Sequence, residues 1–155
     1  MAKNKMKFKA LDYRYQRVVV DASVLSKIFL EEKGKEEVYS LMEMKMKGEV
    51  TVLATPLLVY ELLNVLSKTF KDFEKVQSVY ERFKEFQISL IDPDDKFVSE
   101  ATKDSCENNT VSYYDASYHA LARDMDCVFI TADEKYYDAM KKKGRIVLFV
   151  AGGRI

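Results

Sequence analysis

Three consecutive valines, Val18 to Val20, end directly on Asp21, and the residues after Asp21 change to helical spacing. A β-branched run without polar residues is typical of a strand that is buried on both faces. The apolar residues between Val24 and Leu30 recur at the spacing of one helix face. A buried strand that passes at once into a helix is the basic unit of a parallel α/β sheet.

This alternation of strand and helix continues to the end of the chain, which indicates a parallel sheet covered on both faces. We expect strands at 17–20, 50–54, 88–91, 127–130 and 146–150, and helices at 22–32, 35–47, 56–70, 72–86, 95–108, 112–125 and 134–143. The predicted fold class is therefore a three-layer α/β/α sandwich with a central, mainly parallel sheet of four or five strands. Residues 17–155 should form one domain, with 1–16 as a separate arm.

Composition agrees with one globular domain, because 48% of the 155 residues are hydrophobic and 32% are charged. Neither a membrane-spanning run nor a signal peptide is recognisable, so we expect a cytoplasmic protein without a membrane partner. Cys106 and Cys127 lack the spacing of zinc ligands and are expected to be reduced thiols. The net charge is zero, but residues 1–17 carry six basic residues against one acid, a local charge of +5. Such an arm suits contact with phosphates, and a solvated, partly disordered arm is the alternative.

Four acidic residues stand at positions where a site can form. Asp21 and Asp133 each lie between a predicted strand and a helix, and Asp115 lies in the first turn of a helix. Each aspartate also has a simpler explanation as a helix cap, since Ser112 and Asp115 have capping-box spacing. Glu61 is harder to explain, because a carboxylate among leucines needs a positive partner or a proton. That partner can be a metal ion, or a lysine or arginine of the core.

Taken together, the four acids indicate a metal site. Asp21 and Asp133 follow parallel strands, so both should lie at the sheet edge where α/β proteins bind ligands. Asp115 and Glu61 can reach the same crevice from their helices. Carboxylates without histidine or cysteine ligands suit Mg²⁺ or Mn²⁺ better than zinc. An ion held in this way can bind a phosphate and activate a water molecule.

The segments around these acids resemble the PIN domain in order and spacing over residues 17–150. They are Val-Val-Val-Asp-Ala-Ser at 18–23, Leu-Val-Tyr-Glu-Leu-Leu-Asn-Val-Leu at 58–66, Tyr-Tyr-Asp-Ala-Ser-Tyr-His-Ala-Leu-Ala at 113–122 and Phe-Ile-Thr-Ala-Asp-Glu at 129–134. The most similar subgroup is the VapC-type toxins of toxin–antitoxin pairs. The domain at 17–155 is therefore expected to be PIN-like.

This resemblance implies an endoribonuclease in which Mg²⁺ or Mn²⁺ activates water, leaving a 5′-phosphate and a 3′-hydroxyl. The acids that match the family's catalytic and metal-binding quartet are Asp21, Glu61, Asp115 and Asp133. Residues expected to support them are Ser23, Asn64 and Thr131. RNA is the implied substrate, a small antitoxin the implied partner, and a homodimer the expected assembly. Candidate contact residues for the antitoxin or the second subunit are Met42, Met44 and Phe70.

Several alternatives stay open at this point. His119 shares a helix face with Asp115 and can join the metal site or lie in the core. Aromatic residues of the same helix, Tyr113, Tyr114 and Tyr118, can stack on bases or belong to the core. The phosphatase motif Asp-x-Asp and the paired acids of a phosphoacceptor domain are both missing. The rival function is a non-catalytic PIN-like module that binds RNA or protein, and the complete set of four acids argues against it.

Overall fold

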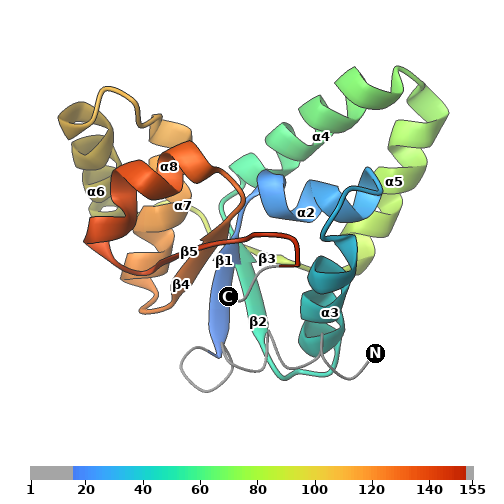
Figure 1. Cartoon of the computed structure of the whole chain (residues 1–155), viewed down its shortest axis with the longest axis horizontal. Helices are drawn as coiled ribbons and strands as arrows, with labels where there is room; N and C mark the ends of the chain where they lie inside the picture. The colour runs from blue at the N-terminus through green and yellow to red at the C-terminus, as the bar shows by residue number, and fades with distance from the viewer. Residues whose placement is uncertain (1–15, 153–155) are drawn as a thin grey trace.

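The computed structural model describes residues 16–152, so nearly all of the predicted arm at 1–16 lies outside the described residues. At its centre is a sheet of five parallel strands in the order β3-β2-β1-β4-β5 (Figure 1). The strands are β1 (Arg17–Val20), β2 (Thr51–Ala54), β3 (Ser89–Leu90), β4 (Val128–Thr131) and β5 (Ile146–Leu148). All four pairings are parallel. The predicted sheet is confirmed.

Helices cover both faces of this sheet (Figure 1). They are α2 (Ala22–Phe29), α3 (Lys35–Met46), α4 (Leu57–Phe70), α5 (Phe73–Glu85), α6 (Asp95–Glu107), α7 (Tyr113–Asp124) and α8 (Glu134–Met140), with a short 3₁₀ helix, η1 (Lys141–Lys143). The chain steps one way along the sheet from β1 to β3 and the other way from β3 to β5. Because such crossovers are right-handed, α2 to α5 lie on one face and α6 to α8 on the other. The three-layer prediction is confirmed.

The two middle strands and α7 form the part of the core that supports the site. Val18, Val19 and Val20 are buried on both faces of the sheet, as are all residues of β4. α7 packs on β1 and β4, and its buried face includes the small residues Ala116 and Ala120. Small side chains let a helix approach a sheet closely. The start of α7 is thereby held over the carboxyl ends of β1 and β4.

Some local predictions need correction. Met42 and Met44 are buried rather than exposed, because α3 turns them towards the core, and Phe70 is only partly exposed. The apolar residues of this region that do face solvent are Met46, Tyr60 and Phe73. α4 begins after Pro56 without a side-chain cap. Both cysteines are free, and Cys127 is buried whereas Cys106 is exposed.

Candidate active site

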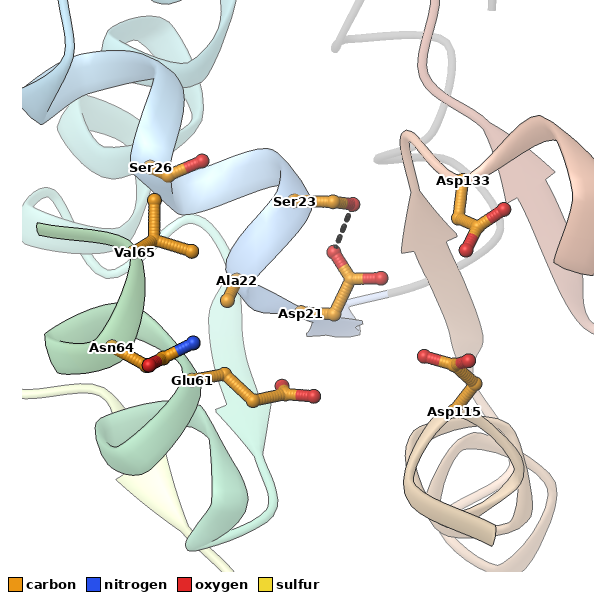
Figure 2. Close-up of a pocket in the computed structure, with 9 residues that line it drawn as sticks. All are labelled: Asp21, Ala22, Ser23, Ser26, Glu61, Asn64, Val65, Asp115 and Asp133. Carbon is orange, nitrogen blue, oxygen red and sulfur yellow. Dashed lines mark hydrogen bonds between the residues drawn. The ribbon is translucent and has the colours of Figure 1, made fainter. Parts of the chain in front are cut away.

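A pocket of about 320 Å³ lies at the carboxyl ends of β1 and β4. Four carboxylates point into it, with Glu61 on one side, Asp115 and Asp133 on the other, and Asp21 between them (Figure 2). The lining residues are Asp21, Ala22, Ser23, Ser26, Glu61, Asn64, Val65, Asp115 and Asp133. The fold therefore gathers the four acids from separate parts of the chain around one space.

Asp21 is the most firmly held of the four. It caps α2, and its Oδ1 accepts hydrogen bonds from the Val24 N–H at 3.2 Å and the Ser23 hydroxyl at 2.5 Å. Its Oδ2 accepts from the Thr131 hydroxyl at 2.6 Å. The Thr131 oxygen in turn accepts from the Asp133 N–H at 3.1 Å. Ser23 and Thr131 thus fix both oxygens of Asp21, and Thr131 links Asp21 to the loop that carries Asp133.

Asp133 is a helix cap as well as a pocket residue, and Asp115 is bonded to the residue that caps its own helix, Ser112. Asp133 begins α8, and its Oδ1 accepts from the Tyr136 N–H at 3.0 Å. Asp115 accepts from the Ser112 hydroxyl at 2.7 Å, while its own N–H donates to that hydroxyl at 3.1 Å. These bonds occupy one oxygen of each carboxylate and orient the other. The capping explanation considered from the sequence is correct for Asp21 and Asp133, whereas α7 is capped by Ser112, and in each case the arrangement is compatible with a site.

Among the described residues, Glu61 contacts a hydroxyl and not the lysine or arginine that was one of its expected partners. Its Oε2 accepts from the Tyr118 hydroxyl at 2.5 Å, and within residues 16–152 no lysine, arginine or histidine forms an ion pair with it. Tyr118 is fully buried and stacks on Phe129, so it cannot stack on a base. The sequence feature that could have indicated a role for Tyr118 at the site is its position three residues after Asp115, on the same helix face. Asn64 lines the pocket, but no described hydrogen bond joins it to Glu61, and its supporting role stays a prediction.

Replacing Tyr118 by phenylalanine should separate orientation of Glu61 from packing. The ring keeps its stacking on Phe129, so we expect the free energy of unfolding to fall by only about 1 kcal/mol, the worth of one hydrogen bond. If Glu61 acts in the pocket, activity should fall by about 10-fold or more, as is typical when a partner of a metal ligand is lost. Urea unfolding and a cleavage assay measure the two effects. Tyr137→Phe, outside the pocket lining, should change neither.

Burial is the main reason why the pKa values of three of these acids are raised. It raises the pKa of Asp21 from 3.8 to about 6, against the lowering effect of its hydrogen bonds. Desolvation also raises the pKa values of Glu61 and Asp115. Repulsion adds to it, from Glu61 on Asp21, from Asp115 on Glu61 and from Asp133 on Asp115. No lysine or arginine is among the lining residues, so the pocket is a concentrated negative site.

A family model of the PIN domain matches residues 18–142, which spans all four acids and the whole sheet except β5. The chain belongs to the PIN domain family. PIN domains are generally nucleases, and they generally use divalent metals. The resemblance seen in the sequence motifs is confirmed at the level of the family. No match is found among curated protein sequences.

Solved structures with the same fold include three proteins at low sequence identity. PAE2754 from Pyrobaculum aerophilum is 20% identical over 84% of this chain and 82% of its own, with a TM-score of 0.61. VapBC2 from Rickettsia felis, bound to a DNA fragment from their promoter, is 14% identical over 86% and 97%, with a TM-score of 0.65. FitAcB from Neisseria gonorrhoeae is 14% identical over 87% and 98%, with a TM-score of 0.64. Such identities establish a shared fold.

The donor set of this PIN domain suits a hard divalent cation. All four acids offer oxygen, and neither histidine nor cysteine lines the pocket. In the arrangement seen, however, no three acidic, histidine or cysteine side chains of residues 16–152 are grouped closely enough to hold an ion together. Mg²⁺ usually keeps several water molecules and uses only one or two carboxylates directly. The pocket therefore fits a hydrated ion better than one enclosed by protein.

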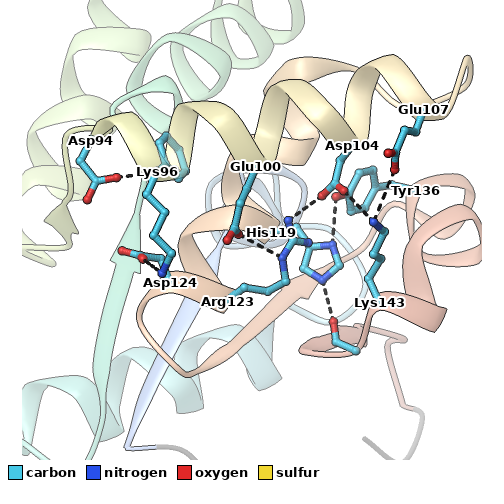
Figure 3. A network of polar contacts seen from close by, with 12 residues as sticks. Asp94, Lys96, Glu100, Asp104, Glu107, His119, Arg123, Asp124, Tyr136 and Lys143 are labelled. Atoms are coloured by element: carbon cyan, nitrogen blue, oxygen red, sulfur yellow. Dashed lines mark hydrogen bonds and ion pairs between the residues drawn. The ribbon is translucent and has the colours of Figure 1, made fainter.

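A second buried aspartate of this PIN domain shows what a purely structural acid looks like here. Asp104 on α6 is 2% exposed, and its Oδ2 accepts from Arg123 at 2.6 Å (Figure 3). Lys143 lies 3.2 Å from its Oδ1. Asp21 is equally buried, yet no described basic residue forms an ion pair with it. The fold therefore pairs one buried acid with two cations, whereas the other is held by hydrogen bonds from neutral groups.

Asp104→Ala should destabilise the protein by about 3 kcal/mol, because it leaves the largely buried Arg123 without its main partner. Lys143→Ala removes the more exposed cation of the same cluster and should cost less than about 1 kcal/mol. Chemical unfolding of both variants measures the difference. Equal losses would mean that the Asp104–Arg123 pair does not hold α6 on α7.

The remaining aromatic candidates and His119 fall outside the pocket lining. Both ring nitrogens of His119 have partners within the protein, Tyr136 and Gly144, so we set aside its proposed role as a metal ligand. Tyr113 is partly buried against the core, whereas Tyr114 faces solvent.

Of the described helices, none is long and apolar enough to cross a membrane.

Proposed function

We propose that this PIN domain is a Mg²⁺- or Mn²⁺-dependent endoribonuclease that acts as the toxin of a toxin–antitoxin pair. The observation that carries the proposal is the group of four carboxylates around one pocket, without a basic residue in its lining. Burial raises the pKa values of three of them, Asp21, Glu61 and Asp115, so the site is costly for the fold unless a cation binds there. The chain also belongs to a family that is generally nucleolytic, and this supports metal-dependent catalysis as the function of the buried acids.

In the proposed reaction each acid has a role that follows from its contacts. Asp21 has both oxygens fixed by hydrogen bonds and is suited to hold the ion at a constant position. Asp115 and Asp133 are oriented by hydrogen bonds at the starts of their helices, and they add negative charge on the other side of the pocket from Glu61. The chemistry that a bound ion supplies is positive charge beside the attacking water and the leaving oxygen. The Oε1 atom of Glu61 has no described hydrogen bond, and in the proposed reaction it accepts the proton of the attacking water.

RNA as the substrate is supported by aromatic surface next to the acids. Tyr60 and Tyr114 are 73% and 59% exposed, and each precedes a pocket acid directly in the sequence. Exposed aromatic rings stack on unpaired bases in proteins that bind single strands. Tyr60 was not among the aromatic residues considered from the sequence, since it was taken as part of an apolar helix.

The proposed partner is a small antitoxin, and the proposed assembly is a homodimer. Two of the similar folds, VapBC2 and FitAcB, support an antitoxin partner. The surface that this chain offers to either partner includes Met46 and Phe73, which are both 72% exposed. These residues replace Met42 and Met44 as the candidate contacts.

The test of the proposed function is cleavage of single-stranded RNA by the purified chain in Mg²⁺ or Mn²⁺ and in EDTA. We expect endonucleolytic products with the metals and none with EDTA, and DNA of the same sequence should serve as the comparison substrate. Cleavage that persists in EDTA would contradict the metal site. RNA binding that is unchanged by EDTA and never leads to cleavage would favour the non-catalytic module.

A further inference from the structure

His119 is the only histidine of the chain, and it is fully buried. Its Nε2 lies 2.7 Å from the carbonyl oxygen of Gly144, and its Nδ1 lies 3.1 Å from the Tyr136 hydroxyl (Figure 3). A carbonyl oxygen can only accept, so Nε2 carries the proton, and Nδ1 accepts from the tyrosine. Burial lowers the pKa of His119 from 6.5 to about 4, which keeps the ring neutral at physiological pH. The tautomer is therefore fixed by its surroundings.

These two hydrogen bonds join α7 to both ends of the segment that follows Asp133. Tyr136 lies in the first turn of α8, and Gly144 directly follows η1. Within residues 16–152, the bond between His119 and Tyr136 is the one side-chain hydrogen bond from α7 to α8. The imidazole is thus placed to hold this segment against the helix that carries Asp115.

The same residues lead directly to two pocket acids. Asp115 lies one helical turn before His119 on α7, and Asp133 accepts from the backbone N–H of Tyr136 at 3.0 Å. Beneath them, the rings of His119 and Tyr136 pack on Phe129 of β4, with centroids 6.0 and 5.9 Å away. Asp115 and Asp133 stand on different helices, so their separation depends on what ties those helices together.

We propose that His119 is a positioning residue, whose hydrogen bond with Tyr136 sets the spacing of Asp115 and Asp133 and thereby the affinity of the pocket for a divalent cation. The inference rests on the proposed function, because it needs an ion at these acids. Partners that orient metal ligands typically change metal affinity by about 10- to 100-fold when they are removed. A histidine that only fills the core would leave metal affinity unchanged.

The test uses variants that differ in which hydrogen bond they keep. Tyr136→Phe removes only the bond between α7 and α8. His119→Leu removes both bonds, whereas His119→Gln keeps one donor and one acceptor on its amide. Tyr137→Phe is the matched control, because Tyr137 lies beside Tyr136 on α8 without a described contact to His119. The Mn²⁺ dissociation constant of each folded variant is measured by calorimetric titration without RNA.

We expect the Mn²⁺ dissociation constant to rise about 10-fold in Tyr136→Phe and at least as much in His119→Leu. His119→Gln should recover most of the affinity, and Tyr137→Phe should match the wild type. A folded Tyr136→Phe variant with wild-type affinity overturns the inference and leaves the proposed function intact. A wild-type chain that binds no Mn²⁺ overturns both.

Nitrogen NMR of the single imidazole gives a readout that does not depend on metal. The wild type should have a protonated Nε2 and an unprotonated Nδ1 at neutral pH. In Tyr136→Phe the Nδ1 resonance should shift while the Nε2 resonance stays near its position, since the bond to Gly144 remains. A proton on Nδ1 in the wild type would overturn the inference.

Discussion

Asp21→Asn should abolish metal-dependent RNA cleavage by this PIN domain while leaving the fold intact. Asparagine has nearly the same shape, and its oxygen can still accept from Val24 and Ser23. What disappears is the negative charge at the most firmly held position in the pocket. Loss of a partner that only orients a ligand costs about 10- to 100-fold in activity, so loss of a ligand should exceed about 100-fold. Initial rates of RNA cleavage in saturating Mn²⁺ measure the effect.

The matched control is Asp92→Asn, which removes one negative charge from an exposed turn outside the pocket. It should cleave RNA at the wild-type rate. Equal rates for Asp21→Asn and the wild type would remove Asp21 from the mechanism. Equal losses of cleavage rate in Asp21→Asn and Asp92→Asn would mean that the rate depends on the overall charge of the protein and not on the pocket.

The sequence predicts the acids of this pocket because local rules place them. Asp21 and Asp133 follow buried strands, and parallel strands end at the same edge of a sheet. Asp115 follows Ser112 at capping distance, which fixes it in the first turn of a helix. Each of these positions depends on residues within a few places in the chain. The sheet was predictable for the same reason, since its strands are short, apolar and separated by clear helices.

The contacts that hold the acids in place were not predictable, because they join distant residues. Tyr118 bonds Glu61 across 57 residues, and His119 bonds Tyr136 across 17. From the sequence of their own helix alone, Tyr118 was a candidate for base stacking and His119 a candidate for metal binding. Met42 and Met44 were wrong as surface contacts, although the spacing of Val38, Leu41 and Met42 in the sequence already indicates the side of α3 that meets the core.

A large stability effect should come from the same substitution, Asp21→Asn, in the absence of metal. The pKa of Asp21 is about 6 in the fold against 3.8 for the free side chain. Between these values the folded protein keeps a proton that the unfolded chain has lost, so the contribution of Asp21 to stability falls as pH rises from about 4 to 6. The total fall is roughly 3 kcal/mol. In EDTA, Asp21→Asn should therefore gain about that much on the wild type between pH 4 and pH 7, as measured by urea unfolding.

The comparison with the variant is needed because His119 acts in the opposite direction. Its pKa is about 4 in the fold against 6.5 for the free side chain, so here the unfolded chain binds the extra proton between these values. The contribution of His119 rises with pH over nearly the window in which that of Asp21 falls. In the wild type these two contributions therefore oppose each other, while the raised pKa values of Glu61 and Asp115 add a further fall in stability as pH rises. Both proteins contain His119, so their difference isolates Asp21.

Mn²⁺ should reverse the order of the two proteins at pH 7.5. An ion that binds only the folded state stabilises the wild type by about 4.1 kcal/mol at 1,000 times its dissociation constant, which exceeds the advantage of the variant in EDTA, whereas the variant should gain little from the ion. The gain should fade below about pH 6, because protonated carboxylates bind metal poorly and the pKa of Asp21 lies near that value. If Mn²⁺ stabilised Asp21→Asn as much as the wild type, the ion would be binding elsewhere. The cost of burying Asp21 would then have no explanation in metal binding.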